Sequence, residues 1–257
     1  MSHPVAIIQA RIGSTRLRGK VLLPLCGSPM LWHIVQRCRA AEGIADVVVA
    51  TTDQPADDAI VAMCTAYGIP CFRGSEHDVL DRYYQAALAY GTDPVIRVTG
   101  DCPLVMPDLI TNVLRCLEDG QYDLVGVNTG AGASEGWQYP DGVDTEGFTQ
   151  QTLWWLWRFA PQGSAREHVS PYAWHHPDYV RIGRIVAPED LGAYRWTVDH
   201  AEDYALVKHI YDALWQPDRH FTLDDVVEYL AAHSEICQLN REHVGAEGYE
   251  KLWAEIE

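Results

Sequence analysis

The segment VAIIQARIGSTRLRGK, residues 5–20, decides the fold of this 257-residue chain. Its first part, Val5–Ala10, is an apolar run that ends in a polar loop, which is typical of a buried β-strand. The loop Arg11–Lys20 then holds four cations, two hydroxyls and two glycines within ten residues. Exposed amides, guanidiniums and an ammonium in a loop that leaves a sheet edge are suited to binding a polyphosphate. The segment therefore predicts a first strand followed by an anion site.

Further strands and helices alternate down the chain from this segment. Apolar runs predict strands at Asp46–Thr51, Ile69–Phe72, Pro94–Thr99 and Tyr122–Val127. Helices are predicted over Ser28–Glu42, Pro55–Tyr67, Asp78–Tyr90 and Pro107–Asp119, with Ser28 and Pro29 starting the first. This alternation predicts an α/β fold, a mostly parallel sheet with helices on both faces in a three-layer sandwich. Ligands of such sheets bind beyond the carboxyl ends of the strands, where the polar clusters of this chain fall.

The pattern changes beyond Val127. Residues 128–140 are rich in glycine, alanine and serine and predict a loop. The remaining predicted elements are helices over Gln151–Phe159, Arg166–His176 and Ala201–Trp215, a helix from the N-cap Thr222 to Leu230, and a strand over Tyr194–Val198. For Trp154, Trp155 and Trp157 we favour packing in the core or in a dimer over stacking on a ligand. We expect one domain over residues 1–257, with a smaller acceptor or dimerisation region within 128–193.

The composition excludes several classes of function. Lys and Arg number 19 and Asp and Glu 36, giving a formal net charge of −17, which disfavours binding to nucleic acid. No apolar run is long enough to span a membrane, and the first residues do not resemble a secretory signal. The seven cysteines form no CxxC pair, and adjacent His175 and His176 cannot point to one metal. We therefore expect a cytoplasmic protein with reduced thiols.

Two acidic segments follow predicted strands. Asp101 stands in Thr99-Gly-Asp-Cys-Pro103, directly after a buried strand, and Asp199 precedes a predicted helix. Each carboxylate is open to two interpretations: a ligand of Mg²⁺ beside substrate phosphates, or a cap of the helix that follows. The basic loop is not a P-loop, because five residues separate Gly13 and Gly19 where four are needed.

These motifs, in their order along the chain, resemble those of the cytidylyltransferase family, which activates sugars as CMP derivatives. The resemblance extends over about Val5 to Trp215 and is closest to the spore coat polysaccharide biosynthesis protein F branch; CMP-KDO and CMP-acylneuraminate synthetases are more distant. Arg18 stands where members often have proline. The matching blocks are Ala10–Val21, Leu25–Leu31, Phe72–Tyr84, Thr99–Leu104, Asp141–Glu146, Arg166–Val169 and Thr197–Asp203.

The resemblance implies a Rossmann-like, GT-A-like nucleotidyltransferase fold and a role for each matching residue. Arg16, Lys20 and Asp101 would be catalytic, and Asp101 and Asp199 would hold Mg²⁺. The CTP nucleotide would bind at Ala10, Arg11, Gly13, Ser14, Arg16, Lys20, Thr52, Asp53, Gly74, Asp81 and Arg82. A small anionic acceptor would bind at Asp141, Asp144, Glu146, Arg166 and His168, although Arg166-Glu167-His168 is equally compatible with a solvated helix start. The enzyme is expected to be a homodimer.

Three classes of function remain open, the first of which is the one that the resemblance implies. The first is CMP transfer from CTP, with pyrophosphate release, to a sugar acid, a sugar phosphate or a phosphonate. The second is a glycosyltransferase that uses a nucleotide sugar, although such enzymes usually hold a metal with an Asp-x-Asp element and have no use for the Arg11–Lys20 loop. The third is a module that binds nucleotides without catalysis, against which Lys20, Asp101 and Asp199 argue together.

Overall fold

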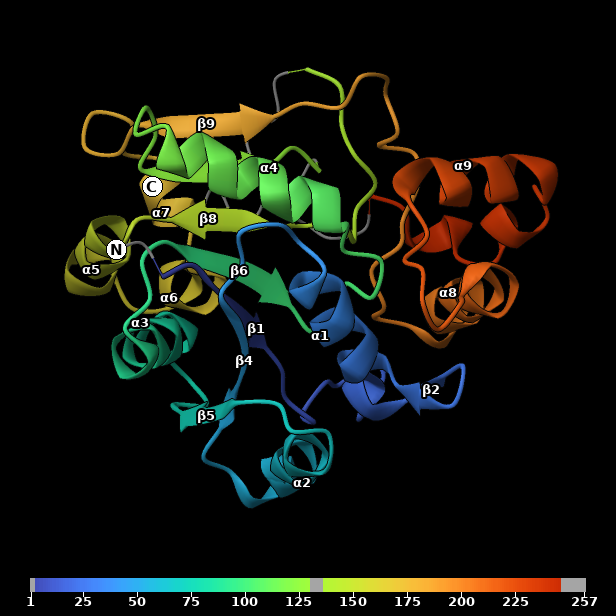
Figure 1. Cartoon of the computed structure of the whole chain (residues 1–257), viewed down its shortest axis with the longest axis horizontal. Helices are drawn as coiled ribbons and strands as arrows, with labels where there is room; N and C mark the ends of the chain where they lie inside the picture. Colours follow the sequence, from blue (N-terminus) through green and yellow to red (C-terminus); the bar gives the residue numbers. More distant parts are fainter. Residues whose placement is uncertain (1–2, 130–135, 246–257) are drawn as a thin grey trace.

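The computed structural model describes residues 3–129 and 136–245, and in that part of the chain a seven-stranded sheet lies between two layers of helices (Figure 1). Residues 130–135 of the predicted glycine-rich loop lie outside the described residues. In order across the sheet the strands are β5 (Cys71–Gly74), β4 (Asp46–Thr52), β1 (Val5–Gln9), β6 (Val95–Thr99), β8 (Glu146–Phe148), β7 (Leu124–Val127) and β9 (Ile182–Ile185). All neighbouring strands are parallel except β8, which is antiparallel to both β6 and β7. The predicted mostly parallel α/β fold is confirmed.

Alternate residues of the central strand explain the two helical layers. Ala6 and Ile8 enter one apolar core and Val5 and Ile7 the other, because successive side chains of a strand point to opposite faces. The first core is covered by α1 (Met30–Arg39), α2 (Asp58–Ala66), α4 (Pro107–Glu118), α8 (Ala201–Leu214) and α9 (Leu223–Ala232). The second is covered by α3 (Val79–Tyr90), α5 (Gln150–Phe159), α6 (Ser164–His168) and α7 (Pro171–Trp174).

Some sequence predictions were wrong in detail. Ser28 and Pro29 form β3 (Ser28–Pro29), which pairs with β2 (Pro24–Leu25), and α1 follows directly, with Pro29 at its N-cap and no side-chain cap from Ser28. The segment 194–198 is not a strand, since only an isolated bridge joins Arg195 to Asp141. One predicted helix, Arg166–His176, is two short helices, broken at Val169 by a positive φ of 73°.

Two strands of the seven-stranded sheet, β8 and β9, were not predicted. β8 has three residues, and its Gly147 is needed because a Cβ there would lie 2.5 Å from Leu117. Short one-turn helices complete the described chain at η1 (Lys20–Leu22), η2 (Pro55–Asp57), η3 (Ile236–Gln238) and η4 (Arg241–His243). None of the described helices is long and apolar enough to cross a membrane. The cysteines are all free thiols.

Candidate active site

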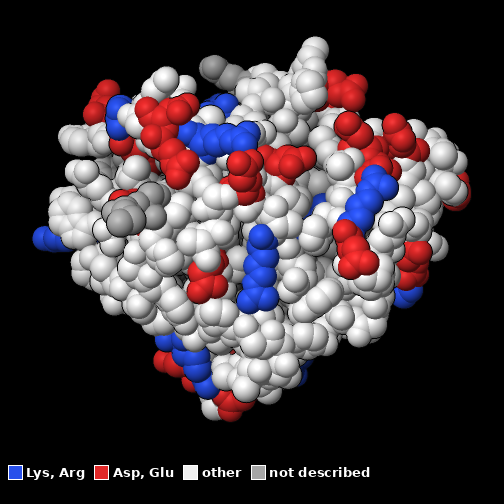
Figure 2. Space-filling model, in the orientation of Figure 1, with Lys and Arg blue, Asp and Glu red and all other residues white. Residues whose placement is uncertain are grey.

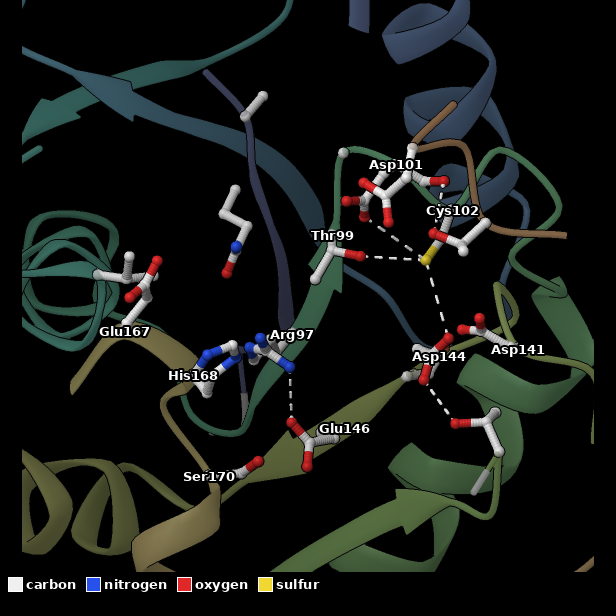
Figure 3. Close-up of a pocket in the computed structure, with 18 of the residues that line it drawn as sticks. Arg97, Thr99, Asp101, Cys102, Asp141, Asp144, Glu146, Glu167, His168 and Ser170 are labelled. Atoms are coloured by element: carbon white, nitrogen blue, oxygen red, sulfur yellow. Dashed lines mark hydrogen bonds and ion pairs between the residues drawn. The ribbon is translucent and has the colours of Figure 1, made fainter. Parts of the chain in front are cut away.

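A cavity of about 500 Å³ lies where the carboxyl ends of β1 and β6 meet the start of β8. Gly100 closes this edge of the sheet: its N–H donates to the Gln9 carbonyl at 2.8 Å, and a Cβ would lie 2.7 Å from that oxygen. Only glycine therefore lets the end of β6 approach the end of β1 this closely. The turn aims Asp101 into the cavity (Figure 3).

The basic loop Arg11–Lys20 forms one wall of the cavity. Its backbone is fixed at both ends, since the Ile12 N–H donates to Asp57 at 2.7 Å and the Gly19 N–H donates to the Ile12 carbonyl at 3.1 Å. Gly19 has a φ of 71°, which glycine adopts without strain and which turns the chain into η1. Lys20, the first residue of η1, is thereby buried against the cavity.

Lys20 joins the two acidic residues singled out in the sequence. Its Nζ donates to Asp101 Oδ2 at 2.9 Å and to Asp199 Oδ1 at 2.8 Å, although the two carboxylates lie far apart in the sequence. Burial alone would lower the pKa of Lys20, but the two carboxylates raise it above its usual value. Burial likewise opposes ionisation of Asp101, yet Lys20 lowers the pKa of that carboxyl to about 2. Lys20 and Asp101 are therefore both charged at neutral pH.

Neither carboxylate caps a helix, which was the alternative interpretation. α4 begins after Met106 and α8 after His200, and the side chain that serves the start of α8 is Asp203. Asp199 instead turns toward the basic loop, where its Oδ2 lies 3.0 Å from Arg16. The Val198 N–H donates to the Asp101 carbonyl at 2.8 Å, so backbone pairing brings the two acidic segments together.

The buried Arg195 holds Asp199 in place together with two further carboxylates. The residue is 2 % exposed, and its guanidinium lies 2.9 Å from Asp141, 3.2 Å from Asp199 and 3.1 Å from Asp203. The three carboxylates offset the cost of burying this cation, and together they raise its pKa. Because Asp141 and Asp199 share the guanidinium, the two sides of the cavity are held at a fixed separation.

Three further carboxylates, Asp141, Asp144 and Glu146, line the cavity. Asp144 accepts from the Thr129 hydroxyl at 2.5 Å and from the Gly142 N–H at 2.7 Å, and Glu146 accepts from Arg97 at 2.8 Å. Burial and the neighbouring Asp144 raise the pKa of Asp141 to about 7, against the opposing effect of Arg195. Figure 3 shows Asp141 and Asp144 close together near Cys102, and Glu146 beside Arg97.

Most of the residues that the resemblance indicated do line the cavity: Ala10, Arg11, Gly13, Ser14, Arg16, Lys20, Arg82, Asp101, Asp141, Asp144, Glu146, His168 and Asp199. Their roles stay predictions.

Five other predicted residues do not line the cavity. Arg166 is buried, pairs with Asp78 at 2.7 Å and does not line this cavity; its expected contact with the acceptor stays a prediction. Asp81 accepts from the Trp157 indole at 2.8 Å.

The other three lie near β5. Thr52 donates to Asp57, the residue that anchors the basic loop, and Asp53 is exposed at the surface. Gly74 lies behind Arg82, where a Cβ would stand 3.1 Å from that side chain. Thr52 and Gly74 thus support residues that line the cavity, one step removed from it.

Sequence reasoning missed several lining residues, among them Gln9, Arg97, Trp174 and Arg184. Arg97 gave a signal, because an arginine inside the apolar strand PVIRVT needs a buried partner, here Glu146. Trp174 and Arg184 belong to no motif that we recognised.

The cavity also offers a place for a divalent cation. Asp101 and Asp199 contact one ammonium, and carboxylate oxygens of this kind, with substrate phosphates, are what Mg²⁺ prefers. A second set, His200, Glu202 and His243, lies at the start of α8, but the two imidazole rings stack face to face with centroids 3.9 Å apart. Nitrogen lone pairs lie in the ring plane, so parallel rings do not converge on one ion.

The surface agrees with the acidic composition. On the face drawn in Figure 2, Lys and Arg side chains stand singly, mostly near acidic groups, and no broad basic patch covers the face. Strong cation clustering is what binding to a nucleic acid backbone requires. The basic loop is instead committed to the cavity.

Comparison with known proteins identifies the family. The family model described as cytidylyltransferase matches residues 5–247. The chain belongs to the cytidylyltransferase family. The spore coat polysaccharide biosynthesis protein SpsF of Bacillus subtilis is 35% identical over 218 residues, 82% of this chain and 87% of that protein. A 3-deoxy-manno-octulosonate cytidylyltransferase of Brucella anthropi is 37% identical over 126 residues, 47% of this chain and 49% of that protein.

A solved cytidylyltransferase from Leptospira borgpetersenii has the same fold. It superposes with a TM-score of 0.84 at 28% identity, covering 93% of this chain and 98% of that one. The family and enzyme class that the motifs predicted are confirmed, and the match favours a nucleotidyltransferase over a glycosyltransferase.

Proposed function

We propose that this protein transfers CMP from CTP to a small anionic acceptor and releases pyrophosphate. The observation that carries the proposal is Lys20, held between Asp101 and Asp199 at the edge of a cavity whose wall is the basic loop. Membership of the cytidylyltransferase family supports CTP as the donor, and the Brucella relative's name supports a sugar acid as one kind of acceptor.

The basic loop binds the triphosphate. Arg16 offers a planar pair of donors to two phosphate oxygens, whereas Lys20 offers one compact charge. Both cations contact Asp199, and these carboxylate contacts fix their positions in the wall of the cavity. The Gly13–Ser14 backbone, which also lines the cavity, lies within the same wall.

Mg²⁺ is part of the proposal, and the donor set fits it. Asp101 and Asp199 would hold the ion, because both carboxylates line the cavity and contact the same ammonium of Lys20. The ion would neutralise charge on the phosphates. Lys20, already protonated and buried, supplies a second positive charge that favours departure of pyrophosphate.

In the reaction an acceptor oxygen attacks the α-phosphorus of CTP, a new P–O bond forms, and the bond to pyrophosphate breaks. A phosphate or phosphonate acceptor attacks as an anion and needs no base. A hydroxyl acceptor must lose a proton, and Asp141 and Asp144, which line the cavity close together, are the carboxylates that would take it up. The pKa of Asp141, about 7, suits a group that takes up a proton near neutral pH.

Pyrophosphate release tests the proposal. Each nucleotide is incubated with a panel of sugar acids, sugar phosphates and phosphonates, with Mg²⁺ or with excess chelator. We expect release with CTP and Mg²⁺, little with UTP, and loss of turnover in D101N, because removing a metal ligand costs several kcal/mol of transition-state stabilisation. Equal turnover with UTP would defeat CTP selectivity, and full activity in chelator would remove the metal.

The expected homodimer and the acceptor region within 128–193 remain part of the proposal. Light scattering on the purified chain measures the first, and a monomeric mass would contradict it.

A further inference from the structure

One arginine of the cavity differs from its neighbours. Arg16 and Lys20 are paired with Asp199, and Arg97 with Glu146. Arg184 of β9 also lines the cavity, yet among the described residues its guanidinium makes neither an ion pair nor a hydrogen bond. A half-buried cation facing a cavity without a partner is positioned to receive an anion from outside the protein.

An aromatic ring holds this guanidinium in place. The Arg184 Cζ lies 4.8 Å from the centre of the Trp174 ring, a cation–π contact. A guanidinium held over a ring keeps the N–H donors in its plane available, and these donors match the two oxygens of a carboxylate or phosphate.

The Trp174 ring is itself fixed. Its Nε1 donates to Glu146 Oε1 at 3.3 Å, and it packs over Gly126, where a Cβ would lie 3.0 Å from the ring. Arg184 is therefore linked through Trp174 to Glu146, and through Glu146 to Arg97.

Two further polar atoms beside this group lack partners. Gln9 Oε1 and Arg97 Nε are buried and have no hydrogen-bond partner in the described part of the chain. Gln9 pairs with Thr99 across the β1–β6 register, and Arg97 precedes Thr99 by two residues, so all three side chains point to one face of the sheet. Figure 3 shows Arg97, Glu146, His168 and Ser170 around one space on this side. Buried polar atoms left unsatisfied in this way are suited to the hydroxyls of a ligand.

We propose that Arg184, held on the Trp174 ring, binds the oxyanion of the acceptor, while Gln9 and Arg97 bind its hydroxyls. The oxyanion is a carboxylate or a phosphoryl group, and the acceptor is a polyhydroxylated acid. This inference rests on the proposed function and assigns the anchoring role to a residue outside every recognised motif.

Calorimetric binding without nucleotide tests the assignment. The probes are 3-deoxy-manno-octulosonate, N-acetylneuraminate and its methyl ester, glucose 1-phosphate, and glucose. The variant R184M removes the charge and keeps much of the stem, and R184K keeps a charge without the planar donors. The matched control is R158M, because Arg158 also lies over a ring, 5.5 Å from the centre of Phe159, but is exposed and outside the cavity.

We expect the wild type and R158M to bind at least one acidic probe equally, and more tightly than its neutral counterpart. R184M should lose about tenfold or more in affinity for that acid, as expected for a hydrogen bond to a charged group, and R184K should lose less. CTP affinity should stay within about twofold in R184M. The acid that binds, carboxylate or phosphate, identifies the oxyanion.

Wild-type affinity for the acids in R184M would overturn the inference. So would loss of CTP affinity in its place, or failure of every acid to bind the wild type. If the acids bind through Arg184 but CTP yields no pyrophosphate, the proposed function fails while the anion subsite stands.

Discussion

Replacement of Arg195 by methionine should destabilise the protein more than any comparable change on its surface. Arg195 is 2 % exposed and neutralises Asp141, Asp199 and Asp203 together. Methionine fills similar space without charge, so the variant R195M leaves three carboxylates without their shared cation.

The expected size follows from this burial. Removing one partner of a buried ion pair typically costs about 3–5 kcal/mol. For a chain of this length each kcal/mol lowers the melting temperature by about 2–4 °C, so we expect a fall of about 6–20 °C. The matched control is R181M, because Arg181 also pairs with a carboxylate, Asp123, but its side chain is 60% exposed. Exposed pairs of this kind contribute about 1 kcal/mol or less.

Urea unfolding of wild type, R195M and R181M at pH 7 measures the difference. The slope against urea is compared as well, since a changed slope would indicate a change in the unfolded state rather than a lost contact. A loss in R195M no larger than in R181M would refute the argument that Arg195 is the counter-ion of this cluster.

Two further predictions concern charge in the cavity. K20M should mainly lower kcat and R16M should mainly raise the KM for CTP, because Lys20 is buried beside Asp101 and Asp199 whereas Arg16 reaches the cavity from the exposed loop. Steady-state kinetics at a fixed acceptor concentration measure both effects, and wild-type kcat/KM in both variants would exclude the basic loop from function. Burial and Asp144 raise the pKa of Asp141 from 3.8 to about 7. Between about pH 4 and pH 7 the native state therefore keeps a proton that the unfolded chain has released, and the contribution of Asp141 to the free energy of unfolding falls as the pH rises through this range. D141N should reduce that fall in urea unfolding at pH 5 and pH 7, and an identical pH dependence in both proteins would contradict it.

The sheet could be predicted where its strands are long and apolar. Val5–Gln9 and Asp46–Thr52 are buried on both faces, and their sequences show it directly. β8 could not be predicted, because Glu146–Phe148 is short and holds Gly147. The Leu117 side chain packs against Gly147 and leaves little room for a Cβ at this position. That contact exists only after the fold has formed.

Some residues of the candidate site could likewise be predicted from the sequence, and others depend on contacts that form only in the folded protein. Arg16, Lys20 and Asp101 lie together because parallel strands end at one edge, which the sequence reveals. Arg166 could not be placed from its motif, because its partner Asp78 lies at the start of α3 and only tertiary packing brings α3 and α6 together. Arg184 follows from no motif at all, and its position depends on the pairing of β9 with β7.

Because β8 runs antiparallel to its neighbours, two sets of cavity residues belong to different segments of the chain and can change independently during evolution. The residues proposed to bind the nucleotide follow strands β1 and β6, whereas Asp141 and Asp144 precede β8 and reach the same edge from the opposite direction. The connection from β7 to β8 thus leaves and rejoins the sheet beside the cavity, with both ends held by neighbouring strands. Under the proposed function, substitutions or insertions in this connection can alter which acceptor fits, while the residues proposed to bind the nucleotide keep their positions. A chimaera that carries residues 128–145 of another family member is the natural route to redirect such an enzyme to a new acid.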